Sequence, residues 1–219
     1  MQFNNSNLIE GLAGKLIVSC QDYTEIMVDA AIRGGAAGFR INSPRSIRIA
    51  RSKTDLPIVG CNKMYFPNSP IYITPSIRAA LALIDAGADI VAIDCTNRHR
   101  VRQSPPEIIQ AIHKAGVLVV ADISCAEEAG DSVKAGADII ATTLAQEFDL
   151  DFIRKVVKFG RPVLAEGHVM TPELAKQALE AGAWAVCIGT AITRPHLLTK
   201  MFANALENEY EMPTHFHRR

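Results

Sequence analysis

Polar side chains directly follow the short apolar runs of this sequence. Ionised and hydrogen-bonding groups are costly to bury without partners, so their regular recurrence at these places indicates a shared polar site. Lysine and carboxylate groups in such a site could transfer protons, and arginine could hold an anion. The polar residues at the ends of the runs are Gln21, Arg40, Asn42, Lys63, Asp94, Asp122, Thr142, Thr143, Glu166 and Thr190.

Lys63 follows the run "LPIVGC" and shares one alternating face with Val59 and Cys61. If Val59 packs inside a barrel, the period of two brings Lys63 to the mouth of that barrel. With a pKa lowered by burial and by a cation such as Arg40, its amine could abstract a proton next to a carbonyl or form a Schiff base. The alternative is a surface lysine just past a strand.

Glu166 ends the seventh run, nearly opposite Lys63 around a closed barrel. Two groups on opposite sides could serve the two faces of one carbon atom. The alternative is a carboxylate that neutralises the cavity by pairing with Lys63 or Arg40, since buried charges need partners. The same alternative applies to Asp94 and Asp122.

The segment "CIGTAITRP" predicts a phosphate site. Gly189 permits close backbone approach after the eighth run, and a short helix opening at Thr190 would present free N–H groups. Gly167 would supply the other half of this site, and Arg194 would complete it or cap the cavity. The alternative is that the glycines serve only tight turns.

These polar groups belong to an internal repeat of about fifty residues. Its apolar runs are rich in Val and Ile and apolar on both alternating faces, which is typical of parallel strands covered on both sides. Related runs occur at 34–42, 86–96, 135–144 and 181–190, and four others lie between them at 15–21, 56–63, 116–124 and 161–167.

Amphipathic stretches between the runs predict helices at 76–87, 105–116, 151–160 and 171–182. Thr74 and Thr171 are the predicted N-caps, each followed by proline. Eight strand–helix units predict a single α/β domain over residues 1–219, a (β/α)₈ TIM barrel, whereas five or six would have favoured an open doubly wound sheet. The predicted helix terminators are Gly87, Gly116, Gly136, Gly160 and Gly182.

The composition of the chain argues against a nucleic-acid-binding protein and against a membrane-spanning one. With 48% hydrophobic residues and 23 basic against 23 acidic side chains, the chain can bury a large core but lacks the positive field of a nucleic-acid-binding protein. No apolar stretch long enough for a membrane span occurs, so a cytoplasmic protein is expected. No metal-ligand spacing occurs outside the terminal "HFHRR", which is interpreted as a frayed end, and no metal site is expected. The cysteines, interpreted as reduced buried thiols, are Cys20, Cys61, Cys95, Cys125 and Cys187.

Over nearly its whole length the chain resembles the N-acetylmannosamine-6-phosphate 2-epimerases of bacterial sialic acid and amino sugar catabolism. The stretches that carry the resemblance include "LIVSCQ", "GGAAGFRIN", "DLPIVGCNK", "SPIYITPS", "DIVAIDCTNRHR", "VVADIS", "TPELAKQALEAGA" and "GTAITRP". The resemblance implies a barrel of the ribulose-phosphate-binding type and a sugar phosphate substrate. It also implies conversion of N-acetylmannosamine 6-phosphate into N-acetylglucosamine 6-phosphate by inversion at C2, with neither a metal nor an organic cofactor.

The resemblance also implies roles for individual residues. The C2 proton of the ring-opened sugar is α to the C1 aldehyde, so a base can remove it. We hypothesise that Lys63 exchanges this proton, Glu166 assists ring opening or delivers a proton, and Arg40 stabilises the oxyanion. Whether one base or two serves both faces stays open. The family's catalytic pair falls on Lys63 and Glu166, and its substrate-contacting set on Gln21, Arg40, Asp122 and Arg194.

The chain departs from the family pattern at the predicted mouth. The loops after the first and sixth strands are shortened, "KMYFPNSP" replaces the usual Lys-Arg-Asp-Tyr pattern, and His168 stands where arginine is common. Because such loops exclude water and grip the substrate, the alternatives are another amino sugar phosphate or a non-catalytic sugar-phosphate-binding paralogue. A Schiff-base aldolase is a third possibility. A homodimer is expected, since barrels of this size often pair through helices.

Overall fold

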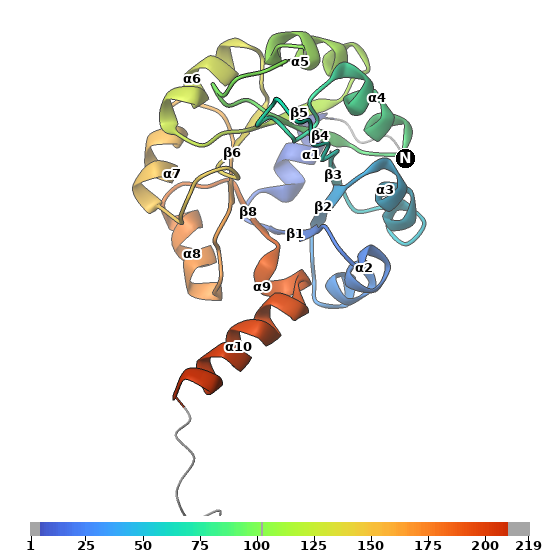
Figure 1. Ribbon diagram of the computed structural model, residues 1–219. Coiled ribbons are helices and arrows are strands. Elements are labelled where there is room, and N and C mark those ends of the chain that lie inside the picture. Colours follow the sequence, from blue (N-terminus) through green and yellow to red (C-terminus); the bar gives the residue numbers. More distant parts are fainter. Residues whose placement is uncertain (1–4, 102, 210–219) are drawn as a thin grey trace, which may run out of the picture.

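The computed structural model of the protein describes residues 5–101 and 103–209. Eight parallel strands form a closed barrel in which β8 pairs back to β1 (Figure 1). This confirms the predicted (β/α)₈ barrel, and every predicted apolar run contains one strand. The strands are β1 (Leu16–Cys20), β2 (Gly38–Asn42), β3 (Ile58–Cys61), β4 (Ile90–Asp94), β5 (Leu118–Asp122), β6 (Ile139–Ala141), β7 (Val163–Glu166) and β8 (Ala185–Ile188).

A ring of helices surrounds the barrel, one after each of the first seven strands. Each buries an apolar stripe against the strands, which is why both faces of every strand are buried. The ring consists of α2 (Thr24–Arg33), α3 (Pro44–Arg51), α4 (Ile77–Asp85), α5 (Pro105–Lys114), α6 (Ala126–Lys134), α7 (Leu150–Val157) and α8 (Pro172–Glu180).

The predicted N-caps have different outcomes. The Thr171 hydroxyl accepts the Leu174 N–H at the start of α8, which confirms that prediction. Thr74 is not a cap, because the cap of α4 is Ser76, whose hydroxyl accepts the Ala79 N–H. Thr74 instead has a left-handed backbone with φ 46°, and its buried hydroxyl donates to a carbonyl of β4. An N-cap residue normally has extended backbone dihedrals, as Thr171 does, and the left-handed backbone of Thr74 does not, so α4 begins later, after Ser76.

The barrel interior is a second apolar core, separate from the layer between strands and helices. Val59 and Cys61 lie in it, as the alternation of β3 predicted. The base of the barrel, at the amino ends of the strands, is closed by α1 (Asn5–Leu12). Leu8 and Leu12 enter the interior core, and the Trp184 indole N–H donates to the Ile9 carbonyl at 2.8 Å.

The chain after β8 leaves the barrel. The short α9 (Thr190–Thr193) follows β8 and contacts β1, and α10 (Pro195–Glu209) then projects away from the barrel (Figure 1). Its apolar side chains Met201, Phe202 and Leu206 are 57%, 73% and 69% exposed. The terminal "HFHRR" lies outside the described residues.

Among the helices in the described ranges, none has the length and apolar character that crossing a membrane requires. The cysteines are all free thiols, and four are buried as predicted. Cys125 is the exception, since it is only partly buried at the start of α6.

Candidate active site

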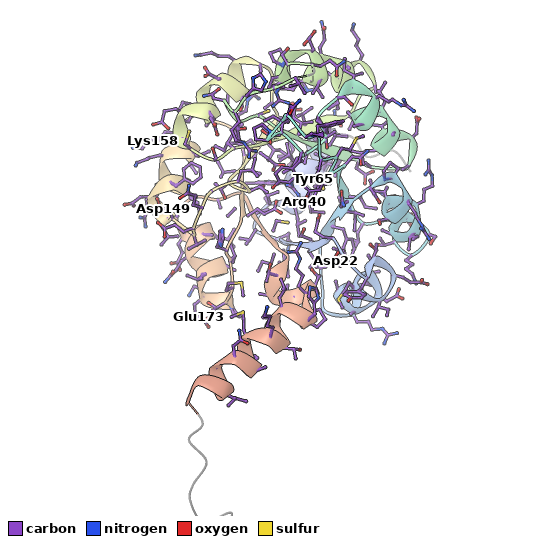
Figure 2. All side chains as sticks on the ribbon, in the orientation of Figure 1. Asp22, Arg40, Tyr65, Asp149, Lys158 and Glu173 are labelled. Carbon is purple, nitrogen blue, oxygen red and sulfur yellow. The ribbon has the colours of Figure 1, made fainter. Side chains whose placement is uncertain are left out.

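A polar cavity of about 140 Å³ opens at the mouth, where the carboxyl ends of the strands meet. Figure 2 shows Arg40 near the centre of the barrel, with Asp22 nearer to the start of α10. Of the residues to which the sequence assigned a catalytic, substrate-binding or phosphate-binding role, Asp122 alone does not line the cavity, because it lies buried against Arg40. The predicted residues that line it are Gln21, Arg40, Lys63, Glu166, Gly167, Gly189, Thr190 and Arg194.

Arg40 is the centre of a buried ion network and is only 1% exposed. Its two terminal nitrogens contact both oxygens of Asp122, at 3.0 and 2.6 Å. The Nη1 atom also donates to Glu166 Oε2 at 2.7 Å. The Thr143 hydroxyl lies 2.6 Å from Asp122 and 3.1 Å from Glu166. Glu166 therefore pairs with Arg40, which is the alternative to a catalytic role that its sequence position left open. Its carboxyl group still lines the cavity.

Two carboxylates share this one guanidinium, and this sharing shifts pKa values. Burial alone would lower the pKa of Arg40, but Asp122 and Glu166 outweigh that effect and hold it well above its ordinary value. Burial raises the pKa of Glu166; Arg40 opposes this rise and the neighbouring Asp122 adds to it. A raised pKa lets a carboxyl group keep its proton to higher pH, which is the property a general acid needs.

Lys63 stands at the start of a hairpin of residues 62–74 that follows β3. It forms an antiparallel bridge with Ile73, and its backbone N–H donates to the Asn42 side chain at 2.9 Å. The Met64 N–H donates to the Tyr72 carbonyl, also at 2.9 Å. The lysine side chain is partly buried and reaches the cavity from this fixed backbone.

Gln21 offers an unused acceptor. Its amide nitrogen donates to Ser19 Oγ at 2.9 Å, which directs the side chain along the cavity wall. Its Oε1 atom is buried and has no hydrogen-bond partner among the described residues. Because an unpaired buried acceptor costs free energy, a ligand hydroxyl or amide N–H would be favoured at this place.

The predicted phosphate-binding residues gather at one side of the cavity. Gly167 has a φ of 98°, and Gly189 precedes α9. A Cβ atom at Gly189 would lie 3.3 Å from the Ser19 Cβ atom, so glycine permits this close approach. The Arg194 side chain also faces this part of the cavity and lies 3.6 Å from an oxygen of Asp22.

Two residues that line the cavity were given no role from the sequence: Tyr72 beside Lys63 and His168 beside Gly167. Thr143, one of the polar residues at the strand ends, joins the Arg40 network. For Thr143 the signal was its place after β6, whereas nothing in a single sequence marks the ring of Tyr72 as facing the site. Asp94 also ends a strand, but it does not line the cavity, since Arg98 binds its carboxylate at 2.6 Å.

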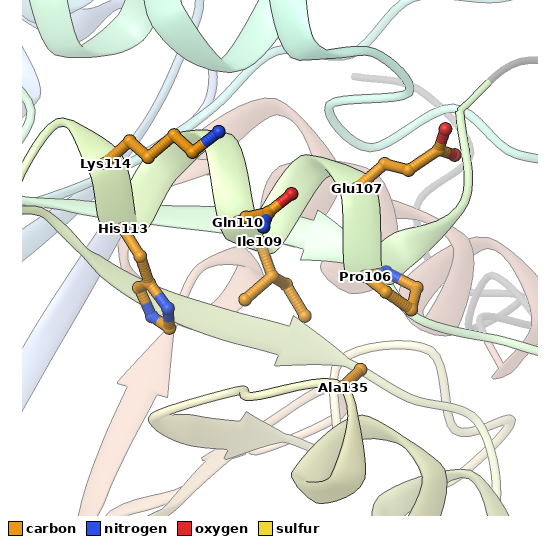
Figure 3. A pocket seen from close by; sticks show the side chains of 7 residues that line it. All are labelled: Pro106, Glu107, Ile109, Gln110, His113, Lys114 and Ala135. Carbon is orange, nitrogen blue, oxygen red and sulfur yellow. The ribbon is translucent and has the colours of Figure 1, made fainter.

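A larger groove of about 690 Å³ runs along the outer face of α5 (Figure 3). It lies on the outside of the barrel, and its titratable side chains are Glu107, His113 and Lys114. Glu107 caps its own helix at Ser104, and His113 pairs with Asp138. The groove therefore lacks the convergent charged groups of the mouth.

A closed parallel barrel with convergent charged groups at its carboxyl end defines a TIM-barrel enzyme. A family model described as "Putative N-acetylmannosamine-6-phosphate epimerase" matches residues 24–208. The chain belongs to this family.

Two relatives are named "Putative N-acetylmannosamine-6-phosphate 2-epimerase". The one from Shouchella clausii is 38% identical and aligns over 91% of this chain and 99% of its own. The one from Clostridium perfringens is 34% identical over 91% and 100%. A solved structure described as the N-acetylmannosamine-6-phosphate 2-epimerase from Clostridium perfringens superposes with a TM-score of 0.88 at 33% identity, covering 94% of this chain and 99% of that one.

Proposed function

We propose that the protein interconverts N-acetylmannosamine 6-phosphate and N-acetylglucosamine 6-phosphate by proton transfer at C2. The observation that carries this proposal is the position of Lys63, whose side chain enters a cavity that also holds the Arg40–Glu166 pair. The names of the relatives support the choice of substrate and reaction. They also disfavour a non-catalytic sugar-phosphate-binding protein.

In the proposed reaction Lys63 removes the C2 proton from the ring-opened sugar. The electron pair of the broken C–H bond forms the C1–C2 double bond and the carbonyl pair moves to the C1 oxygen, giving an enolate. Glu166, whose pKa is raised by burial, delivers a proton to C2 on the opposite face, and proton exchange with water then restores both side chains. Arg40 lies at 2.7 Å from Glu166 and adds positive charge beneath the oxyanion.

The substrate's phosphate is assigned to Gly167, Gly189, Thr190 and Arg194. Glycine backbone permits close approach of an anion, and a guanidinium adds a charged donor. Gln21 binds a sugar hydroxyl or the acylamino N–H through its unpaired Oε1 atom. Asp122 acts from beneath by orienting Arg40.

The test is proton NMR of N-acetylmannosamine 6-phosphate with the protein in D₂O. We expect deuterium at C2 and signals of the N-acetylglucosamine isomer. Lys63→Ala should lower the rate by about 10²- to 10⁴-fold, the usual contribution of a general base. Lys53→Ala is the matched control, because Lys53 forms ion pairs with Asp29 and Glu25 outside the cavity.

Binding without deuterium incorporation would contradict the epimerase proposal. A mass increase at Lys63 after borohydride treatment with substrate would instead identify a Schiff-base reaction.

We further propose that the protein is a homodimer joined through α10. In the helix ring α8 contacts β8 and α2 contacts β1, and an apolar groove of about 500 Å³ lies beside β8, lined by residues of α8 and α9. Its lining includes Leu16, Leu179 and Ile188. The apolar side chains of α10 are exposed in the same chain, so the α10 of a second copy matches this groove in polarity.

Light scattering after gel filtration should give twice the chain mass of 23.8 kDa. Phe202→Asp should shift the mass toward the monomer, because it places a charge in the apolar contact. Phe159→Asp is the control, since Phe159 is an exposed aromatic residue that does not line this groove. A monomeric wild type at micromolar concentration would refute the dimer.

A further inference from the structure

The hairpin of residues 62–74 replaces part of the barrel wall at the mouth. β3 pairs with β4 through two residue pairs only, Val59 with Ile90 and Gly60 with Val91. Beyond them the returning arm of the hairpin takes the place beside β4, because the Asp94 N–H donates to the Ile73 carbonyl at 3.0 Å. The arm of the hairpin that faces Lys63 is therefore part of the rim of the barrel.

Tyr72 is the aromatic residue of this arm and lines the cavity. Its ring stacks on Tyr65 with centroids 5.4 Å apart and planes within 9°. The guanidinium of Arg98 lies 6.0 Å from the same ring, and Asp94 binds that guanidinium at 2.6 Å. Burial raises the pKa of the Tyr72 phenol, so the ring stays neutral. The ring is therefore an immobilised, uncharged wall of the cavity.

The cavity is lined by charged and by uncharged residues. Lys63, Arg40 and Glu166 supply charged groups, and the assigned phosphate residues follow β7 and β8. Tyr72 and Ile73 form the uncharged surface next to Lys63, whereas the uncharged Val169 and Met170 lie after β7.

The C2 atom of the proposed substrate carries both the proton and the acylamino group. When the C–H bond points at Lys63, the acylamino group is attached to the same carbon atom, and the hairpin offers the uncharged surface next to that lysine. Resting on the proposed function, we infer that the Tyr72 ring contacts the N-acyl group and sets the largest acyl group that the site accepts.

The experiment compares N-acetyl- and N-propanoylmannosamine 6-phosphate as substrates. One extra methylene group against a fixed wall changes kcat/KM by about 10-fold or more. Wild type should prefer the acetyl compound by about that factor, and Tyr72→Ala should remove the preference. Tyr72→Phe should keep it, because the ring remains. Tyr65→Ala, which removes the stacking partner, should weaken the preference to a smaller extent.

Phe159→Ala is the matched control for losing a partly exposed aromatic side chain outside the mouth. An unchanged acetyl-to-propanoyl ratio in folded Tyr72→Ala would overturn the inference. Tyr72→Leu serves as the second variant if the alanine variant does not fold. Kd values measured by calorimetry for both compounds test the preference for the acetyl group without relying on catalysis. Absence of epimerisation by wild type would therefore contradict the proposed function without deciding this inference.

Discussion

The base and the mouth of the barrel handle buried charge in different ways. At the base, Asp89 and Asp138 occupy equivalent places in the internal repeat, and each accepts a backbone N–H of the preceding strand at 2.8 Å. Each also has its own cationic or imidazole partner, Arg51 or His113. At the mouth two carboxylates share one guanidinium. A carboxylate with its own partner is satisfied locally. Where two carboxylates share one guanidinium, one carboxyl group holds its proton more tightly.

The backbone shows the same contrast. Left-handed conformations cost residues other than glycine about 1–2 kcal/mol, and such strain is concentrated at functional sites. Glycine occupies every left-handed position described at the base, whereas four of the five at the mouth carry side chains. The glycines at the base are Gly14, Gly35, Gly87, Gly116, Gly136, Gly160 and Gly182, and the mouth has Tyr23, Ser43, Thr74, His168 and Gly167.

Removing the shared guanidinium should have the largest effect on stability and should show most clearly how the mouth differs from the base. Arg40→Met leaves two buried carboxylates without a cation, so we expect a loss of about 3–5 kcal/mol in the free energy of unfolding. Arg51→Met at the base, where the ion pair is partly exposed, should cost about 1–2 kcal/mol. Urea unfolding followed by circular dichroism measures both. Equal losses would show that sharing at the mouth carries no special cost.

The pH dependence of the free energy of unfolding should distinguish the buried carboxyl group at the mouth from an exposed carboxylate elsewhere. Folded Glu166 has a raised pKa, so the free energy of unfolding should fall as the pH rises from the ordinary value of 4.5 through the raised one. The slope is at most about 1.4 kcal/mol per pH unit for one proton. Glu166→Gln lacks this contribution, so its stability relative to wild type should rise with pH.

Glu107 gives the opposite sign and serves as the control for Glu166. Hydrogen bonds from the Ser104 hydroxyl and backbone N–H lower the pKa of Glu107. Its contribution to stability is therefore present above the ordinary carboxyl pKa and lost as the pH falls. Glu107→Gln should remove that acid-side loss. Stability profiles of the same sign for both variants would contradict the assignment.

Changing left-handed residues should have the smallest effects. Gly160 has a φ of 73° and open space where a Cβ atom would lie, so Gly160→Ala should cost about 1 kcal/mol through the backbone alone. His168 has a φ of 58°, so His168→Gly should raise stability by about 0.5–1 kcal/mol. Thermal unfolding measures both changes. A destabilised glycine variant would mean that the imidazole contributes more than its backbone costs.

The strands could be predicted because their physical cause is local. A run that is apolar on both faces, such as the one containing Val59 and Cys61, has few stable alternatives to a covered parallel strand. The alternation of β3 then placed Lys63 correctly at the mouth. The eight strand–helix units predicted closure of the barrel in the same way.

Other features depend on contacts between distant parts of the chain. The pairing of Glu166 with Arg40 joins two strands on different sides of the barrel, so spacing in the sequence could not distinguish it from a free carboxylate. The hairpin carrying Tyr72 and the packing of α1 under the barrel were not foreseen, because neither shows a long periodic pattern. An amphipathic stretch such as α10 predicts a helix but does not say which surface covers it.

The plug formed by α1 makes the mouth the entrance and exit of the described barrel. Leu8 and Leu12 fill its base, and the Trp184 bond to the Ile9 carbonyl fixes the plug. Under the proposed function, substrate and product then enter and leave through the same opening and compete for the same unoccupied site. Each isomer should inhibit the conversion of the other competitively, so net flux slows as the mixture approaches equilibrium.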